Sequence, residues 1–169
     1  MVAFSGILEQ TAAVMSADAT ESKLRSLGYQ LPPVPNTAGS YLQSVRSGHL
    51  LFLSGGLPID GDTLITGKVG VDLDIESAQH AARLCVLGRL AVIKAEIGSL
   101  DRIQRVVALN GFVNSGPEFF DHPKVINGAS DFLIEVLGDR GRHSRTALGA
   151  PALPLNAAVE LNLIVEITD

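Results

Sequence analysis

The residues best suited to chemistry in this chain are a run of basic side chains ahead of its last segment and a glutamate inside that segment. The basic run extends from Arg140 to Arg145, and Glu160 follows it. A guanidinium stays charged and can bind a carboxylate through two hydrogen bonds, and a well-placed glutamate can accept and return a proton. The simplest interpretation from residue types is an ion pair of Arg145 with Glu160 or Glu166. A carboxylate ligand for Arg145 is the alternative, and the residues themselves leave both open.

The histidines and the single cysteine do not indicate a metal centre. The chain has four histidines, and no two of them have the spacing of metal ligands. We expect His122 to cap a helix and His143 to lie on the surface beside its arginine neighbours. Cys85 cannot form an internal disulfide and falls in an apolar stretch, which favours burial as a small hydrophobic side chain. The sequence therefore predicts neither a metal site nor a thiol nucleophile.

Length and composition predict one domain without a nucleic-acid surface. A chain of 169 residues with 46% hydrophobic content is long enough to bury one substantial core. Its formal net charge of -5 opposes a broad phosphate-binding surface, which requires clustered lysine and arginine. No apolar run approaches the roughly 20 residues needed to span a bilayer, and the start of the chain lacks the pattern of a signal peptide. The expected compartment is the cytoplasm, with no membrane partner.

Two long helices and a final strand stand out in the hydrophobic pattern. Residues 75–97 form the longest predicted helix, and most of its circumference is apolar or small. Its polar residues on one narrow stripe are Glu76, His80, Arg83 and Lys94. A second helix is predicted to begin near Pro123 and to end at Gly138. Residues 159–167 alternate between apolar and polar side chains, which predicts a strand with one face against a core.

The remaining segments are shorter. They are a helix at 20–28, strands at 41–45 and 49–54 about a turn at 46–48, a glycine-rich loop at 55–70 and a strand at 103–113. This order predicts an α+β domain over residues 20–169, with both long helices on one face of a sheet, after an extension at residues 1–19. The other face carries apolar groups such as Val45 and Ile164, so we expect it to pack against another copy of the chain.

Several short blocks of sequence carry a family resemblance. The blocks are Gly39-Ser40-Tyr41, Leu51-Phe52-Leu53-Ser54-Gly55, Thr66-Gly67-Lys68-Val69-Gly70, Ser144-Arg145-Thr146, Ala152-Leu153-Pro154 and Val159-Glu160. Across residues 28–168, the chain resembles the reactive-intermediate deaminases, which are also called YjgF-like proteins. The spacing from the arginine to Leu-Pro and then to Val-Glu is the most specific part of this resemblance.

The resemblance implies a fold, an assembly and an activity. The fold would be chorismate-mutase-like with a mixed sheet, and three chains would form a homotrimer with clefts between the subunits. The activity would be hydrolysis of reactive imine and enamine acids, such as those derived from 2-aminoacrylate, to 2-oxo acids and ammonia. The corresponding enzymes are 2-iminobutanoate/2-iminopropanoate deaminases, which use no metal or organic cofactor.

The resemblance also implies roles for individual residues. Arg145 matches the arginine that binds the substrate carboxylate, and Glu160 matches the glutamate that positions the attacking water. The expected lining of the cleft is Tyr41, Ser54, Gly55, Asn127 and Ala147. Two positions depart from the family, since Ala147 stands where a cysteine is frequent and Gly56 stands where a glutamine is frequent.

Two other functions stay open from the sequence. A non-catalytic trimer that binds small carboxylates would fit the altered cleft residues. Endoribonuclease activity, a label attached to parts of the family, would need a basic path for RNA. The basic side chains available for such a path are Arg140, Arg142, His143 and Arg145. They form a local cluster, and nucleic acid is therefore not the expected partner.

Overall fold

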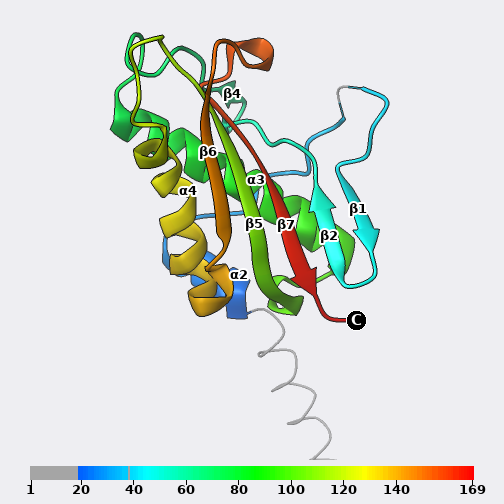
Figure 1. Cartoon of the computed structure of the whole chain (residues 1–169). Helices are drawn as coiled ribbons and strands as arrows, with labels where there is room; N and C mark the ends of the chain where they lie inside the picture. The colour runs from blue at the N-terminus through cyan, green and yellow to red at the C-terminus, as the bar shows by residue number, and fades with distance from the viewer. Residues whose placement is uncertain (1–18, 38) are drawn as a thin grey trace, which may run out of the picture.

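A five-stranded mixed sheet organises the part of the chain that the computed structural model describes, residues 19–37 and 39–169. The strand order is β1-β2-β7-β5-β6 (Figure 1). The strands are β1 (Ser44–Ser47), β2 (Leu50–Leu53), β5 (Ile103–Asn114), β6 (Ser144–Ala150) and β7 (Val159–Ile167). Neighbours run antiparallel except β5 and β6, which are parallel and are joined by a crossover through the helix α4 (His122–Leu137).

The helix α3 (Ile75–Ile97) is the longest helix and has the predicted bounds. It begins where Asp74 Oδ1 accepts a hydrogen bond from the Ser77 amide at 2.8 Å. It ends at Gly98, whose φ of 83° is a left-handed conformation that favours glycine. With α4, it covers one face of the sheet (Figure 1). The predicted α+β arrangement, with both long helices on one face, is therefore confirmed.

The start of α4 differs from the prediction. The helix begins at His122, Asp121 occupies the cap position, and no side chain caps the first turn. His122 is therefore the first residue of α4, and the prediction that it caps this helix is wrong. The reason is local, because the His122 ring is hydrogen-bonded to Ser115 and not to a backbone amide of the first turn. The end of the helix at Gly138 is as predicted.

The core lies between the sheet and the two long helices. The core-facing side chains of β7 are Val159, Leu161, Leu163, Val165 and Ile167, all of them buried. The alternation predicted for this strand is confirmed. On the opposite face, Val45, Phe52 and Leu148 are between 41% and 53% exposed. Among the described residues of one chain, no helix covers that face (Figure 1).

The first hairpin is shifted relative to its prediction. Ser44 pairs with Leu53 and Ser47 pairs with Leu50, so the turn consists of residues 48–49. Gly48 has a φ of 60°, which permits a tight two-residue turn. Tyr41 therefore lies in the loop before the strand. The predicted loop at 55–70 also contains a small hairpin, formed by β3 (Ile59–Asp60) and β4 (Thr63–Leu64).

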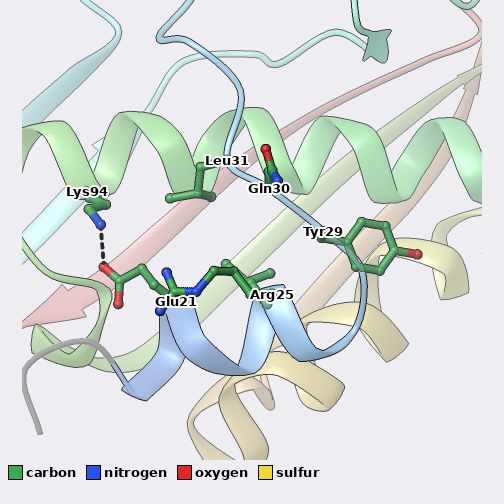
Figure 2. Close-up of a pocket in the computed structure, with 7 residues that line it drawn as sticks. Glu21, Arg25, Tyr29, Gln30, Leu31 and Lys94 are labelled. Atoms are coloured by element: carbon green, nitrogen blue, oxygen red, sulfur yellow. Dashed lines mark ion pairs between the residues drawn. The ribbon is translucent and has the colours of Figure 1, made fainter. Parts of the chain in front are cut away.

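Short helical segments connect the main elements. They are α2 (Ala19–Ser26), η1 (Leu100–Arg102), η2 (Gly138–Gly141) and η3 (Pro154–Asn156). Apart from Ala19, the predicted extension at 1–19 lies outside the described residues. A cavity of about 150 Å³ separates α2 from α3 (Figure 2). At one end of this cavity, Glu21 of α2 pairs with Lys94 of α3 at 3.1 Å.

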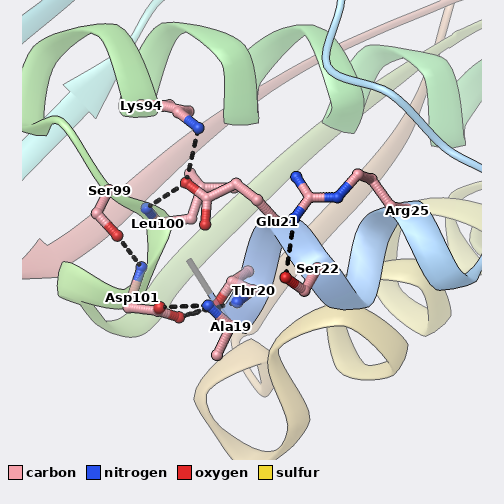
Figure 3. A network of polar contacts seen from close by, with 9 residues as sticks. All are labelled: Ala19, Thr20, Glu21, Ser22, Arg25, Lys94, Ser99, Leu100 and Asp101. Atoms are coloured by element: carbon pink, nitrogen blue, oxygen red, sulfur yellow. Dashed lines mark hydrogen bonds and ion pairs between the residues drawn. The ribbon is translucent and has the colours of Figure 1, made fainter. Parts of the chain in front are cut away.

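Asp101 binds the start of α2 (Figure 3). Its carboxylate accepts hydrogen bonds from the amides of Ala19 and Thr20, at 2.7 and 3.0 Å, and from the Thr20 hydroxyl. Burial would raise the pKa of Asp101, but the hydrogen bonds from Thr20 and Ala19 outweigh that effect and lower the pKa. Asp101 thus supplies, from a distant part of the chain, the acceptor that an N-cap residue normally provides.

Replacing this acceptor should destabilise the fold. We expect Asp101→Ala to lower the free energy of unfolding by about 1–2 kcal/mol, the usual cost of losing a helix cap. Urea unfolding followed by circular dichroism measures the change. Ser22→Ala is the matched control, because the Ser22 hydroxyl contacts only the exposed Arg25 side chain among the contacts described. Equal stability of Asp101→Ala and the wild type would contradict the capping role.

Candidate functional site

Arg145 lies on β6, at the edge of the sheet, and its side chain reaches α4. One guanidinium nitrogen, Nη1, donates to Asn127 Oδ1 at 2.7 Å and to Ser130 Oγ at 3.1 Å. Asn127 and Ser130 are close to one turn apart on α4, so they present their oxygens to the same nitrogen. The arginine itself stays exposed. The structure thus brings Arg145 and Asn127 together and holds the guanidinium in place.

The other basic residues of this region have structural partners. Arg140 donates to the carbonyl oxygens of Asp101 and Ile103 and to the Thr20 hydroxyl. Arg142 pairs with Asp139 at 3.1 Å. Arg140 therefore links η2, the segment after α4, to α2 and to the start of β5. The Arg140 to Arg145 run does not form a continuous basic surface.

His143 differs from the prediction that it lies on the surface. It is half-buried, with Nε2 at 3.0 Å from Ser130 Oγ and Nδ1 at 2.6 Å from the Gly141 carbonyl oxygen. Ser130 Oγ therefore contacts both His143 and Arg145. The His143 imidazole thus helps to fix the position of Ser130, which in turn accepts a hydrogen bond from Arg145.

Further along β6, Ala147 and Gly149 share the face of Arg145, because alternate residues of a strand point the same way. Ala147 is partly buried against the core. A side chain at Gly149 would collide with the His122 ring, whose Nε2 lies 3.0 Å from Ser115 Oγ. A cavity of about 260 Å³ opens beside this pair. This cavity therefore lies beside the end of β6, from Gly149 onwards.

Glu160 lies on β7 and belongs to a second group of residues. Its carboxylate lies directly against Gly55, where any Cβ would collide with Oε1. Burial raises the pKa of Glu160, and the positive charge of Arg89 partly opposes that rise. A half-buried carboxylate with a raised pKa is a stronger base than an exposed glutamate. Gly55 is the residue that lets the main chain approach it.

Ser54 precedes Gly55 and is hydrogen-bonded to the segment that carries Tyr41. The Ser54 hydroxyl donates to the Leu42 carbonyl oxygen at 2.6 Å, and the Ser54 amide donates to the Gln43 carbonyl oxygen at 2.9 Å. Ser54 thus ties the end of β2 to the segment before β1. Tyr41 is 49% exposed in that segment. The structure places Tyr41, Ser54, Gly55 and Glu160 around the same end of β2 and β7.

Arg89 is a residue of this group that the sequence did not indicate. It lies on α3, is 2% exposed, and donates from Nη1 to Gln43 Oε1 at 2.9 Å and to the Ser54 carbonyl oxygen at 3.0 Å. The predicted polar stripe of α3 left it out, because it lies among apolar residues on the buried side. One signal was available, since a buried arginine requires acceptors and therefore a polar neighbourhood.

Arg145 and Glu160 do not meet within one chain. Arg145 is opposite Leu109 of β5, a core residue, whereas Glu160 is opposite Phe112. Residues three apart on a strand point to opposite faces, so the two side chains lie on opposite faces of the sheet. The ion pair of Arg145 with Glu160 or Glu166 is therefore not formed within the chain. Within one chain, the two side chains therefore belong to separate groups of residues.

Comparison with known proteins identifies the family to which this chain belongs. A family model described as "YjgF/chorismate mutase-like, putative endoribonuclease" matches residues 21–167. The chain belongs to this family. The expected YjgF-like, chorismate-mutase-like fold is thereby confirmed.

Three similar proteins illustrate the range of this YjgF-like family. The crystal structure of Atu1372 from Agrobacterium tumefaciens is 47% identical with a TM-score of 0.84, over 90% of this chain and 95% of that one. Protein TCP17 of Trypanosoma cruzi is 41% identical over 159 residues, which cover 93% of this chain and 99% of that protein. A 2-iminobutanoate/2-iminopropanoate deaminase of Dermatophagoides farinae is 28% identical over 138 residues, covering 80% and 92%.

The structure gives a physical reason for one departure of this YjgF-like chain from the family pattern. Gly56 replaces a frequent glutamine, and a Cβ at this position would lie 2.5 Å from Arg89 Nε. Any side chain here would therefore compete with Arg89 for the same space.

Cys85, one turn before Arg89 on α3, is buried as predicted, and burial raises the pKa of its thiol. None of the helices in the described residues is both long and apolar enough to cross a membrane.

Proposed function

We propose that this chain is a deaminase that hydrolyses small imine and enamine acids to 2-oxo acids and ammonia without a metal or organic cofactor. The observation that carries the proposal is the fixed guanidinium of Arg145, held through one nitrogen by Asn127 and Ser130 and still exposed. A planar guanidinium of this kind is suited to a carboxylate with two hydrogen bonds. The similarity to an imine deaminase supports the same activity.

The proposed assembly is a homotrimer that brings the Arg145 group of one subunit next to the Glu160 group of another. Since Arg145 and Glu160 lie on opposite faces of one sheet, one chain cannot present both to a small ligand. A neighbour packed on the exposed apolar face, which carries Val45, Phe52 and Leu148, would bring its own Arg145 towards Glu160. Each cleft would then contain Arg145, Asn127 and Ala147 from one subunit. The other subunit would contribute Glu160, Gly55, Ser54 and Tyr41.

The proposed reaction needs few protein groups. Arg145 holds the substrate carboxylate, and this places the electrophilic carbon of the N-protonated imine next to a water molecule beside Glu160. The Glu160 carboxylate takes a proton from this water as the new C–O bond forms. It returns the proton to the nitrogen, and as the C–N bond breaks and the C=O bond forms, the proton of the new hydroxyl passes through the carboxylate to the departing ammonia. The protonated imine and water thus give a 2-oxo acid and an ammonium ion. The raised pKa of Glu160 makes its carboxylate a stronger base than that of an ordinary glutamate, which favours the first of these transfers.

Loss of Arg145 tests the function. We expect Arg145→Ala to lower kcat/KM for ammonia release from 2-iminopropanoate by about 10²-fold, the usual scale for charge-assisted hydrogen bonds to a substrate. The imine is generated in the assay from alanine by an amino acid oxidase, and ammonia is measured with a coupled dehydrogenase. Arg142→Ala is the matched control, because Arg142 is an exposed neighbour that pairs with Asp139. Equal turnover in Arg145→Ala and the wild type would contradict the proposal.

The alternative function is a trimer that binds small carboxylates without catalysis. Ala147, which carries no reactive group where the family frequently has a cysteine, favours it. Binding of pyruvate to the wild type but not to Arg145→Ala, together with no ammonia from any imine tested, would support this alternative. Endoribonuclease activity has less support, because Arg140, Arg142 and His143 are all engaged within the chain.

A further inference from the structure

Arg89 is a buried cation without an acidic partner. The residue is 2% exposed, and within the described part of the chain no carboxylate forms an ion pair with it. The acceptors that it binds are neutral oxygens of Gln43 and Ser54, and its buried Nε has no hydrogen-bond partner. Burying a charge in this way is costly. A group retained at such a cost calls for a role beyond packing.

Two glycines separate Arg89 from Glu160. The side of Gly55 that would carry a Cβ faces Glu160 Oε1, and the corresponding side of Gly56 faces Arg89 Nε. The wall between the carboxylate and the guanidinium is therefore main chain without side chains. Because neither Gly55 nor Gly56 places a side chain between the guanidinium and the carboxylate, the two charges are only weakly screened from each other. Arg89 also holds this wall in place through its hydrogen bond to the Ser54 carbonyl oxygen.

The charges that act on this pair are few. The titratable groups that influence Arg89 are Cys85 on α3, Tyr41 in the loop before β1 and Glu160 on β7. Cys85 stays a neutral thiol, because burial raises its pKa. After burial, Arg89 is the group that affects the pKa of Glu160. Glu160 is therefore the anion that the charge of Arg89 influences most directly.

We propose that Arg89 is a positioning residue for Glu160: it fixes the Ser54-Gly55-Gly56 main chain against the carboxylate, and its charge stabilises the ionised form of that carboxylate. The contribution of Arg89 to turnover rests on the proposed deaminase function. Its effect on the ionisation of Glu160 does not, and the two can be measured separately.

The direction of the effect follows from the charges. Burial raises the pKa of Glu160, and the nearby positive charge of Arg89 lowers it towards its ordinary value. Removing that charge leaves burial unopposed, so the pKa rises further and the carboxylate takes up a proton at higher pH. A base that accepts a proton from water must be ionised, and the acid limb of the activity profile should move upward with the pKa.

The experiment compares three variants with the wild type. In Arg89→Gln, the charge is lost but a donor for the Ser54 carbonyl oxygen remains, whereas Arg89→Lys keeps the charge. Arg83→Gln is the matched control, because Arg83 is also on α3, has a buried unpartnered Nε and donates to Tyr29 at 2.9 Å. The primary readout is the titration of Glu160 by carbon-13 NMR, with its resonance assigned by its loss in Glu160→Gln. The secondary readout is the pH profile of kcat/KM for ammonia release.

We expect Arg89→Gln to raise the titration midpoint of Glu160 above that of the wild type, because a nearby opposite charge is removed. Arg89→Lys should keep the midpoint close to the wild-type value, and Arg83→Gln should leave it unchanged. An unchanged midpoint in folded Arg89→Gln would overturn the inference, and so would an equal shift in Arg83→Gln. If Arg89→Gln does not fold, Arg89→Met takes its place, because an apolar side chain of similar length can replace a buried charged one. A raised midpoint in Arg89→Met supports the inference, and an unchanged midpoint overturns it. If no variant releases ammonia, the proposed function fails while the NMR result still stands.

Discussion

Mixed trimers of Arg145→Ala and Glu160→Gln subunits should recover about one quarter of the wild-type ammonia release, although each variant on its own is nearly inactive. The reason is the division of the proposed site between subunits. In a random mixture, one cleft in four combines Arg145 from a Glu160→Gln subunit with Glu160 from an Arg145→Ala subunit. Both side chains then meet in one cleft, as they cannot within a single sheet, where they point to opposite faces.

The measurement uses joint unfolding in urea and refolding, followed by the coupled ammonia assay. Each variant refolded alone gives the baseline, and the wild type taken through the same cycle gives the full value. Recovery no greater than the two baselines, with the assembly verified by light scattering, would show that the subunits do not share the site. A monomer in light scattering would reject the proposed assembly directly.

A methyl group at Gly55 should be nearly as damaging as loss of a catalytic side chain. The Cβ of Gly55→Ala would collide with Glu160 Oε1, so the carboxylate must turn away from its place in the proposed reaction. A displacement of this kind is expected to lower kcat/KM by about 10²-fold, since a shift of about 1 Å in a reacting group is sufficient. Steady-state kinetics on 2-iminopropanoate measures the loss.

Gly88→Ala is the matched control for this prediction. Gly88 lies on α3 next to Arg89, and a Cβ there would meet no atom within 4 Å. The exchange should leave kcat/KM unchanged and stabilise the helix by about 0.5–1 kcal/mol, because alanine favours helix more than glycine does. Binding of pyruvate to Gly55→Ala should also persist, since Arg145 is untouched. Full activity in Gly55→Ala would argue that Glu160 takes no part in the reaction.

The parts of the fold with strong periodicity were predictable from the sequence. The helix at 75–97 has a cap residue, an apolar circumference and a terminal glycine, and its bounds are those of α3. The alternation at 159–167 likewise identifies the core face of β7. The bounds of the first hairpin were not predictable in the same way, because they depend on pairing between two strands and not on periodicity within one. Pairing across the turn, set by Gly48, decided where those strands begin and end.

The candidate site was only partly predictable. The resemblance indicated Arg145, Glu160 and Gly55, but not that Asn127 and Ser130 would hold the arginine from α4. The role of Arg89 could not be predicted, because its partners Gln43 and Ser54 are far away in sequence. A long-range contact of this type leaves no periodic pattern that a local reading could detect.

The amino-acid sequence by itself determined the class of fold, the core faces and the residue types available for binding a small acid, because these depend on local periodicity and on the chemistry of single side chains. The tertiary structure decided which of those residues share a site. Strand register places Arg145 and Glu160 on opposite faces, and packing places Arg89 behind two glycines next to Glu160. Both results depend on contacts between distant segments, which form only when the whole sheet and its helices assemble.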